Sequence, residues 1–360
     1  MVNLGRKQNR YYVYWTVEQV NPIEARISPE ARVLHDESLV MDLHCDTLLG
    51  ETLLGYDPQK LHRNRLPGSP WLFHVDIPRL KAGGVGAVAL GIVVNPLRRK
   101  SALRATRQGL AQMAAWPERA PDDVLLVETA EDIRRAQREG KVAVFGGLEG
   151  AHGLSGRLDV LGELRDSGLR YVGLVHFTKN QAATPAFGFR ANPRDGLSDY
   201  GRDLVDELAE RRILVDLAHL NHAGFLEAAA RSPRPVIVSH TGVRGAFDSW
   251  RNIDDEQLRA VADSGGVVCI IFAPYYLEGR TRGAAEGIVR HIKHVIDVVG
   301  EEHVGLGSDF DGFVVPPTDL SDISQMPWLT QLMMDAGLSD GQIRKCLGAN
   351  MLRVFEEVCG

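Results

Sequence analysis

One repeating pattern governs the sequence from Leu39 onward: a short apolar run rich in β-branched residues, a polar or glycine-containing turn, and a stretch with helical periodicity. This alternation is typical of βα units whose strands form a parallel sheet. Eight runs qualify as strands: 40–46, 86–94, 142–149, 171–176, 213–219, 236–240, 266–272 and 304–309. Eight is the number that a (β/α)8 barrel requires. We therefore predict an α/β fold, a TIM barrel.

The segments between these runs suit the crossover helices of such a barrel. Residues 102–115, 130–139, 199–212 and 254–263 have helical periodicity and enough length for right-handed connections, and residues 326–358 form a helical finish. We find no interdomain linker, so we predict a single domain over residues 38–360. Residues 1–37, which include several tyrosines and a tryptophan, are predicted to be an extension that packs on the body or against a second subunit.

Composition excludes several classes of protein. With 44% hydrophobic and 24% charged residues and a net charge of −6, the chain of 360 residues resembles a globular soluble protein without a basic surface for nucleic acid. The four cysteines lack the spacing of a thiolate zinc site, so buried reduced thiols are expected. The first residues contain no apolar signal segment, and no apolar run is long enough to span a membrane. We expect a cytoplasmic protein.

Metal-binding or acid–base side chains stand at the ends of six predicted strands. They are His44 with Asp46, Glu149, His176, His219, His240 and Asp309. A barrel gathers the carboxyl ends of its strands around one axis, where active sites form. The simpler interpretations are chance polar strand ends, or an Asp46 that caps the next helix beside a buried structural His44. The number of histidines favours a common site.

The residue types in this set indicate hydrolysis with metal ions. Imidazole and carboxylate ligands without thiolates suit catalytic Zn²⁺, although Mn²⁺, Co²⁺ or Fe²⁺ fit the same set. We predict two Zn²⁺ ions that share Glu149: one also on His44 and Asp46, the other also on His219 and His240. Two ions about 3.5–4 Å apart can share a water, lower its pKa and polarise a carbonyl, so that the bridging hydroxide attacks.

Two residues of the set remain for proton transfer and substrate contact. Asp309 is suited to accept the proton of the bridging water and pass it to the leaving amine. His176 is suited to donate a hydrogen bond to the developing oxyanion. A role for His176 as a further metal ligand, or as a group that orients one, stays open.

Seven motifs carry a resemblance to a known family: DLHCD at 42–46, GLEG at 147–150, LVHFTKN at 174–180, VDLAH at 215–219, IVSH at 237–240, WRNI at 250–253 and GSDFDG at 307–312. Their order and spacing resemble the membrane dipeptidase (renal dipeptidase) family of zinc peptidases, in particular its bacterial members. The likeness covers roughly residues 38–358 and includes the ending NMLRVF at 350–355.

The resemblance implies a barrel of the metal-dependent hydrolase type that hydrolyses dipeptides, often with a D-residue at the C-terminal position. It implies the same metal ligands, with His176 and Asp309 at the substrate, and it adds Arg251 as the residue that holds the substrate carboxylate. From the residues alone, a surface salt bridge of Arg251 with Asp254 or Asp255 would be preferred. A homodimer is also implied.

Some family features are not expected here. The signal peptide, disulfides and lipid anchor of the animal enzymes have no counterpart in the sequence, and the loop 184–196 is a place where this chain can set its own specificity. Two alternatives remain. One is a barrel amidohydrolase acting on another amide or a lactone, although the chain has no His-x-His first strand and no lysine at a strand end. The other is a metal-binding subunit without catalysis.

Overall fold

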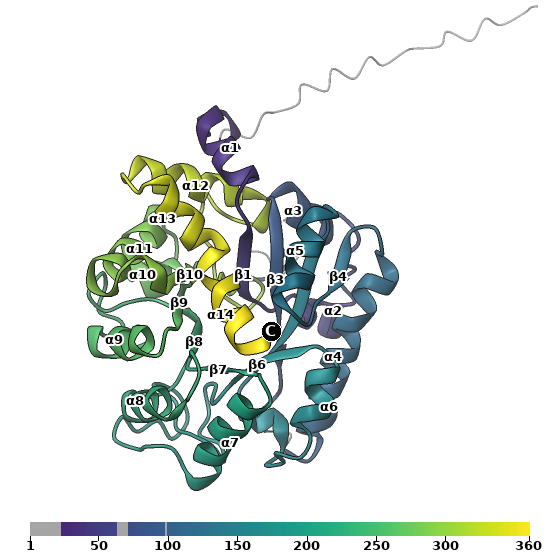
Figure 1. The fold of residues 1–360 in the computed structure, drawn as a ribbon, viewed down its shortest axis with the longest axis vertical. Coiled ribbons are helices and arrows are strands. Elements are labelled where there is room, and N and C mark those ends of the chain that lie inside the picture. The colour runs from purple at the N-terminus through teal and green to yellow at the C-terminus, as the bar shows by residue number, and fades with distance from the viewer. Residues whose placement is uncertain (1–22, 63–70, 98) are drawn as a thin grey trace, which may run out of the picture.

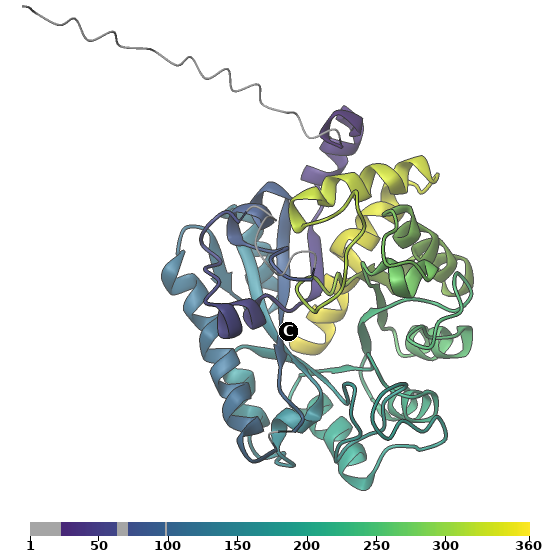
Figure 2. The ribbon, with the colours of Figure 1, turned by 180° about the vertical axis from the view of Figure 1, so that it is seen from behind.

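The computed structural model describes residues 23–62, 71–97 and 99–360, and it confirms the predicted (β/α)8 barrel. Eight parallel strands follow one another in chain order around a near-closed barrel, and helices form an outer ring around them (Figures 1 and 2). The strands are β1 (Val40–Cys45), β3 (Val85–Val93), β5 (Val142–Glu149), β6 (Leu169–Gly173), β7 (Leu214–Asp216), β8 (Ile237–Thr241), β9 (Val267–Ile270) and β10 (Val304–Leu306).

A ninth strand, β4 (Val124–Leu126), was not predicted. It pairs with the first residues of β5, at Val142 to Val144, whereas β6 pairs with the later residues of β5. With only three residues, β4 is too short to give a periodic signal in the sequence. It widens the amino end of the sheet and leaves the carboxyl ends of the eight barrel strands unchanged.

Six predicted strands were too long at their carboxyl ends, three of them by three residues. Strands β6, β7 and β10 end before His176, His219 and Asp309, respectively. His219 and Asp309 have φ angles of 66° and 60°, so the backbone turns out of the strand direction at both residues. A non-glycine residue in the left-handed region costs free energy, and such residues tend to cluster at functional sites. These two side chains therefore project from turns at the barrel mouth.

The barrel closes between β1 and the residues that follow β10. The amide of Asp309 donates to the carbonyl of His44 (2.9 Å), and the amide of Asp46 donates to the carbonyl of Phe310 (2.7 Å). Cys45 and Phe310 form a parallel bridge. Closure thus uses the segment that carries Asp309, which fixes this aspartate beside His44.

The helices alternate with the strands as predicted, with small shifts of their ends. They are α1 (Pro29–Asp36), α2 (Thr47–Leu54), α3 (Ile77–Ala82), α4 (Ala102–Arg119), α5 (Ala130–Arg138), α6 (Leu161–Asp166), α7 (Asp199–Glu210), α8 (His222–Arg231), α9 (Asp255–Asp263), α10 (Pro274–Glu278), α11 (Glu286–Val299), α12 (Met326–Asp335), α13 (Asp340–Arg344) and α14 (Asn350–Cys359). Several begin with side-chain caps: Thr129 before α5 and Asp254 before α9 each form a capping box.

The last helix, α14, lies across the centre of the ring in Figure 1. Phe355 of α14 packs against Phe145 of β5 with ring centroids 5.0 Å apart, within a buried apolar cluster that includes Met351 and Val354. Large aromatic contacts of this kind stabilise a core through buried area and through their edge geometry. Apolar packing therefore fills the barrel interior next to α14, while the polar groups gather at the carboxyl ends of the strands.

The part of the predicted extension that the structure describes contacts the body. The amide of Ser28 donates to Oε1 of Gln331 (2.8 Å), and Nδ1 of His35 lies 2.7 Å from Oγ1 of Thr330, so α1 packs on α12. Residues 1–22, with the aromatic residues, lie outside the described residues, and the division at residue 37 stays a prediction. All four cysteines are buried without a disulfide. Among the described helices, none is both long and apolar enough to cross a membrane.

Candidate metal centre

The residues predicted from the strand ends meet in one buried site at the carboxyl end of the barrel. Glu149, the last residue of β5, stands at its centre. Its Oε1 atom lies near the Nε2 atoms of four histidines: His219 (3.0 Å), His176 (3.4 Å), His240 (3.5 Å) and His44 (3.8 Å). Asp46 Oδ1 and Asp309 Oδ1 lie 3.3 and 3.9 Å from Nε2 of His44.

Small residues on the strands make room for this cluster. A Cβ atom on Gly91 of β3 would lie 2.0 Å from Oδ1 of Asp46, and one on Gly147 of β5 would lie 1.8 Å from the ring of Tyr171. Both distances are too short for atoms that are not bonded to each other, so only glycine fits at these two positions. Asp46 occupies the position before α2, but its side chain makes no capping bond. The prediction that it faces the site rather than the helix agrees with this geometry.

A hydrogen bond fixes the ring of His44 from behind. The hydroxyl of Tyr171 donates to the carbonyl of Leu43 (3.0 Å) and lies 2.7 Å from Nδ1 of His44. Because its only hydrogen points at the carbonyl, the hydroxyl must accept from Nδ1–H. In the neutral ring the lone pair of His44 is therefore on Nε2, which faces Asp46 and Glu149.

His240 is oriented in the same way by a pair of residues that sequence reasoning did not find. The hydroxyl of Ser239 donates to Oδ2 of Asp216 (2.7 Å) and accepts from Nδ1–H of His240 (2.9 Å). The amide of Ser239 also donates to Asp216 (2.8 Å). Groups that hold the second nitrogen of a histidine in this way set its tautomer, as the partners of metal-bound histidines do.

A matching pair lies under the opposite side of the site. Asp42 accepts from the amide (2.8 Å) and the hydroxyl (2.6 Å) of Ser308. Asp42 precedes His44 by two residues and Ser308 precedes Asp309 by one, so this buried pair positions both. The signal for such pairs in the sequence is weak, because an aspartate or serine within an apolar strand has no recognisable spacing.

Carboxylates dominate the electrostatics around His44. Burial alone lowers the pKa of an imidazole, but Asp46, Glu149 and Asp309 outweigh it and raise the pKa of His44 to about 10. Burial and the neighbouring Asp46 raise the pKa of Glu149 well above its usual range. Burial also raises the pKa of Asp309, to about 8. Without a cation, this side of the site binds protons.

The other histidines respond in the opposite direction. Burial, together with the positive charge of Arg251, lowers the pKa of His219 well below its ordinary value. Burial and the charge of His44 do the same for His240. Burial lowers the pKa of His176 to about 3. These three imidazoles are neutral at pH 7, as ligands of a metal must be.

The donor set fits a metal. Nε2 of His44 and Oδ1 of Asp46 are buried and have no hydrogen-bond partner in the described residues. Nε2 of His219 and Nε2 of His240 lie only 2.9 Å apart, and the lone pair of His240 points toward its neighbour. Buried polar atoms of this kind are costly unless something pairs with them. Three overlapping groups of side chains could each hold a cation: His44–Glu149–His240, Glu149–His176–His219 and His44–Asp46–Asp309.

Arg251 is a buried member of the site, with 4% of its surface exposed. Its Nη2 donates to the carbonyl of His240 (2.7 Å) and lies 3.4 Å from Nε2 of His219, and its Nη1 donates to Oγ1 of Thr241 (3.3 Å). The surface salt bridge with Asp254 or Asp255 that the residues alone suggested does not form. Within the described residues, the Nε–H and one Nη1–H have no partner.

Comparison with known proteins identifies the family. The model of the membrane dipeptidase family, peptidase family M19, matches residues 28–359. The chain belongs to this family. It is a metallo-dipeptidase, and its buried histidine and carboxylate groups are consistent with the metal site of such an enzyme.

Relatives of this metallo-dipeptidase include Dipeptidase tcpJ of Claviceps purpurea (strain 20.1), which is 32% identical over 295 residues, or 79% of this chain and 69% of that protein. The crystal structure of dipeptidase AC has 31% identity and a TM-score of 0.79 and covers 90% of this chain and 99% of its own. A metallo peptidase from Rhodobacter sphaeroides has 29% identity and a TM-score of 0.79, with coverage of 89% and 100%. That protein was crystallised with a phosphinate mimic of the dipeptide L-Ala-D-Ala.

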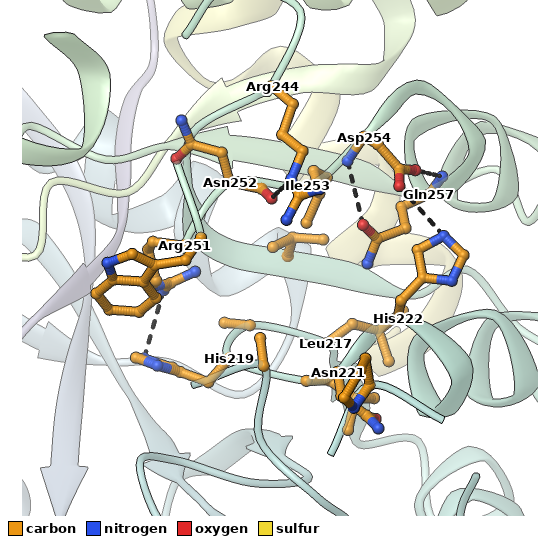
Figure 3. A pocket seen from close by; sticks show the side chains of 16 residues that line it. Leu217, His219, Asn221, His222, Arg244, Arg251, Asn252, Ile253, Asp254 and Gln257 are labelled. Atoms are coloured by element: carbon orange, nitrogen blue, oxygen red, sulfur yellow. Dashed lines mark hydrogen bonds and ion pairs between the residues drawn. The ribbon is translucent and has the colours of Figure 1, made fainter. Parts of the chain in front are cut away.

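A cavity of about 350 Å³ adjoins the metal centre of this dipeptidase. It runs from His219 and Arg251 toward the start of α9 (Figure 3). Trp250 lines it and stacks on Phe187 of the loop after β6, with ring centroids 4.1 Å apart. Gly188 beside Phe187 has a φ of 116°, and a Cβ there would lie 2.1 Å from the carbonyl of Phe177. This glycine allows the loop to reach Trp250.

Proposed function

We propose that this enzyme is a binuclear zinc dipeptidase that hydrolyses dipeptides, including those with a D-residue at the C-terminal position. The observation that carries the proposal is the position of Glu149, whose Oε1 lies 3.0–3.8 Å from four imidazole nitrogens. His44, Asp46 and Glu149 would hold one Zn²⁺, and Glu149, His219 and His240 the other. When bound, such ions polarise the substrate carbonyl and lower the pKa of water.

Arg251 would bind the C-terminal carboxylate of the substrate. Its guanidinium is held by the carbonyl of His240 and the hydroxyl of Thr241, so little conformational freedom is left to lose on binding. It remains a cation although burial lowers its pKa, because a guanidinium is a very weak acid. A buried guanidinium fork recognises a carboxylate strongly because both groups are charged and few waters compete.

His176 and Asp309 would act at the scissile bond. His176 is neutral, so it keeps one N–H that can stabilise the negative charge that develops on the carbonyl oxygen. Asp309 would accept a proton from water and transfer it to the leaving amine. Its raised pKa reflects burial beside other carboxylates. A cation bound nearby favours the ionised form that a general base requires.

The preference for a D-residue is supported by a relative. The Rhodobacter sphaeroides protein that is 29% identical to this chain was crystallised with a mimic of L-Ala-D-Ala. This ligand has a free C-terminal carboxylate, which is the group that Arg251 is proposed to bind. We therefore expect L-Xaa-D-Xaa dipeptides to be substrates, with L-Xaa-L-Xaa as the comparison.

The test combines turnover with metal analysis. The protein is incubated with a panel of L-Xaa-L-Xaa and L-Xaa-D-Xaa dipeptides, released amino acids are measured by mass spectrometry, and metal content is determined on the same sample. We expect about two zinc equivalents, and turnover that chelation abolishes and zinc restores. Two bound metals without turnover of any dipeptide would contradict the substrate and indicate another amide or a lactone. A protein that binds no metal would contradict the mechanism.

Three further statements stay predictions from the sequence: membership among the bacterial representatives of the family, a cytoplasmic location and a homodimer. Light scattering on the purified protein tests the dimer directly.

A further inference from the structure

The cavity beside Arg251 contains a second arginine. Arg244, from the segment between β8 and α9, lines the same cavity of about 350 Å³. In Figure 3 its side chain reaches into the space between Arg251 and Asp254. Two guanidinium groups therefore face one volume that is large enough for a small substrate side chain.

The head group of Arg244 is oriented but not neutralised. Its Nε donates to the carbonyl of Asn252 (3.2 Å), which fixes the plane of the guanidinium. The one carboxylate within 4 Å, in the part of the chain that the structure describes, is Asp248, whose Oδ1 lies 3.8 Å from Nε and whose side chain is 86% exposed. An ion pair this exposed contributes little. Among the described residues, the Nη1 and Nη2 hydrogens of Arg244 have no acceptor, so they can bind a ligand.

The acidic group in the cavity is already used. Oδ1 of Asp254 accepts from the amide of Gln257 (3.0 Å) as the cap of α9, and Oδ2 lies 3.2 Å from Nε2 of His222. Asp254 is the one carboxylate that lines the cavity in the described residues, whereas Arg244 and Arg251 are two cations that line it. The unmatched charge in the cavity is therefore positive.

We propose that this cavity receives the side chain of the C-terminal residue of the substrate, and that Arg244 binds a carboxylate on that side chain. The inference rests on the proposed function, in which Arg251 binds the C-terminal α-carboxylate. A dipeptide that ends in aspartate or glutamate would then place one carboxylate on each arginine. Arg244 is a specificity residue in this scheme and takes no part in bond cleavage.

The experiment compares isosteric substrates. The zinc-loaded enzyme is assayed for kcat/KM on L-Ala-D-Glu against L-Ala-D-Gln, and on L-Ala-D-Asp against L-Ala-D-Asn, with the corresponding L,L pairs. The side chain of Arg244 is 47% exposed, so solvent screens the contact, and we expect the acid to be preferred over its amide by roughly 3- to 10-fold. Arg244→Gln should reduce this ratio to near one, and Arg244→Lys should restore part of it. Arg259→Gln, which removes the same charge from an exposed position on α9, should leave the ratio unchanged.

Charge reversal gives the sharpest result. In Arg244→Glu the preference should change to a C-terminal lysine over the acid. A wild-type acid-to-amide ratio near one, or the same ratio in Arg244→Gln as in wild type, would overturn the proposal. A preference of the wild type for lysine would also overturn it, in favour of Asp254.

Binding separates this proposal from the proposed function. Reduced pseudodipeptides, in which CH₂–NH replaces the peptide bond, are titrated into the same enzyme by calorimetry. Acid-selective binding that Arg244→Gln abolishes, without turnover of any dipeptide, would support the cavity assignment and reject the dipeptidase mechanism. Turnover of dipeptides with no acid selectivity in either measurement would support the dipeptidase function and reject the cavity assignment.

Discussion

The two sides of the metal centre both bury histidines, but they shift the pKa of the imidazole in opposite directions. On one side, His44 lies among Asp46, Glu149 and Asp309, and its pKa is raised to about 10. On the other side, His219 and His240 lie beside Arg251 and other imidazoles, and their pKa values are lowered. All three rings are buried. Burial therefore does not determine the charge of a histidine here; the number of carboxylates within about 4 Å does.

This difference gives the two halves different properties before any metal binds. The His44 half is a site for protons that a cation must displace, whereas the His219–His240 half presents neutral nitrogens that are ready to bind. Glu149 belongs to both halves through one oxygen atom. Substitutions can therefore be designed to disable both halves, the substrate contact, or one half alone.

The largest effect should follow from Glu149→Gln. The amide keeps the shape but removes the charge that faces four imidazoles, so neither half keeps a complete ligand set. We expect kcat/KM to fall by roughly three orders of magnitude or more and the metal content to drop. Dipeptide assays and elemental analysis measure both. Glu163→Gln, at an exposed ion pair with Arg107, is the matched control. Full metal content in Glu149→Gln would contradict a shared ligand.

A smaller loss should follow from His176→Gln, and its form separates two roles. If His176 donates to the oxyanion, kcat falls about 10²- to 10³-fold while metal content stays that of wild type. If His176 is instead a ligand, as its distance of 3.4 Å from Glu149 permits, metal is lost in parallel with activity. We expect the first result. Loss of metal at unchanged kcat per bound ion would contradict it.

A still smaller effect should follow from removing the hydroxyl groups that bind the Nδ1–H groups of His44 and His240. Tyr171→Phe takes away the acceptor of His44 Nδ1–H, and Ser239→Ala takes away that of His240. Each substitution should lower the affinity for one of the two ions by about 10- to 100-fold, the usual cost of losing a hydrogen-bond partner of a metal-bound histidine. Competition with a chelator should then show that one ion is bound more weakly than in wild type and the other with wild-type affinity.

The control for the tyrosine is Tyr56→Phe, since the hydroxyl of Tyr56 is also buried but donates to the carbonyl of Val75 away from the centre. An equal loss of affinity for both ions in Tyr171→Phe would mean that the two halves of the centre do not bind their ions independently.

The barrel and its polar strand ends could be predicted because both depend on spacing along the chain. Eight apolar runs can be counted, and a histidine or carboxylate at the end of a strand reaches the mouth whatever the exact strand boundary. The boundaries were wrong next to His219 and Asp309, which adopt positive φ; histidine and aspartate are enriched in this conformation, but most of them do not adopt it, so the residue type alone does not locate the turn. The three-residue strand β4 was missed for lack of length.

Contacts between residues far apart in the chain could not be predicted from the sequence. The bonds of Asp216 to Ser239 and of Asp42 to Ser308 join residues 23 and 266 positions apart, and nothing in their local pattern marks them. Arg251 shows the same limit. Its neighbours in sequence suggested a surface ion pair, and only the fold turns it inward to the carbonyl of His240. Its position in the site came from the family resemblance, and its role there is still a proposal.

The final prediction concerns protons and uses the opposite pKa shifts directly. In the metal-free protein, His44 with a pKa of about 10 carries a proton at pH 7.5, and His219 and His240, with lowered pKa values, carry none. Metal binding to the His44 half must release that proton. The affinity of this half should rise about tenfold or more per pH unit as the pH increases toward 10, because the proton on His44 competes with the cation and the raised pKa values of Glu149 and Asp309 add further competing protons.

Calorimetric titration of the metal-free protein in two buffers of different ionisation enthalpy measures the proton release at pH 7.5. Wild type should release at least one proton more than His44→Gln, whereas His240→Gln should not reduce the release, because the nitrogen it loses was already neutral. The two variants remove the same chemical group from opposite halves, so fold damage alone would affect them alike. A reduced release in His240→Gln would mean that the carboxylates do not hold the proton on His44, and the contrast between the two halves would fail.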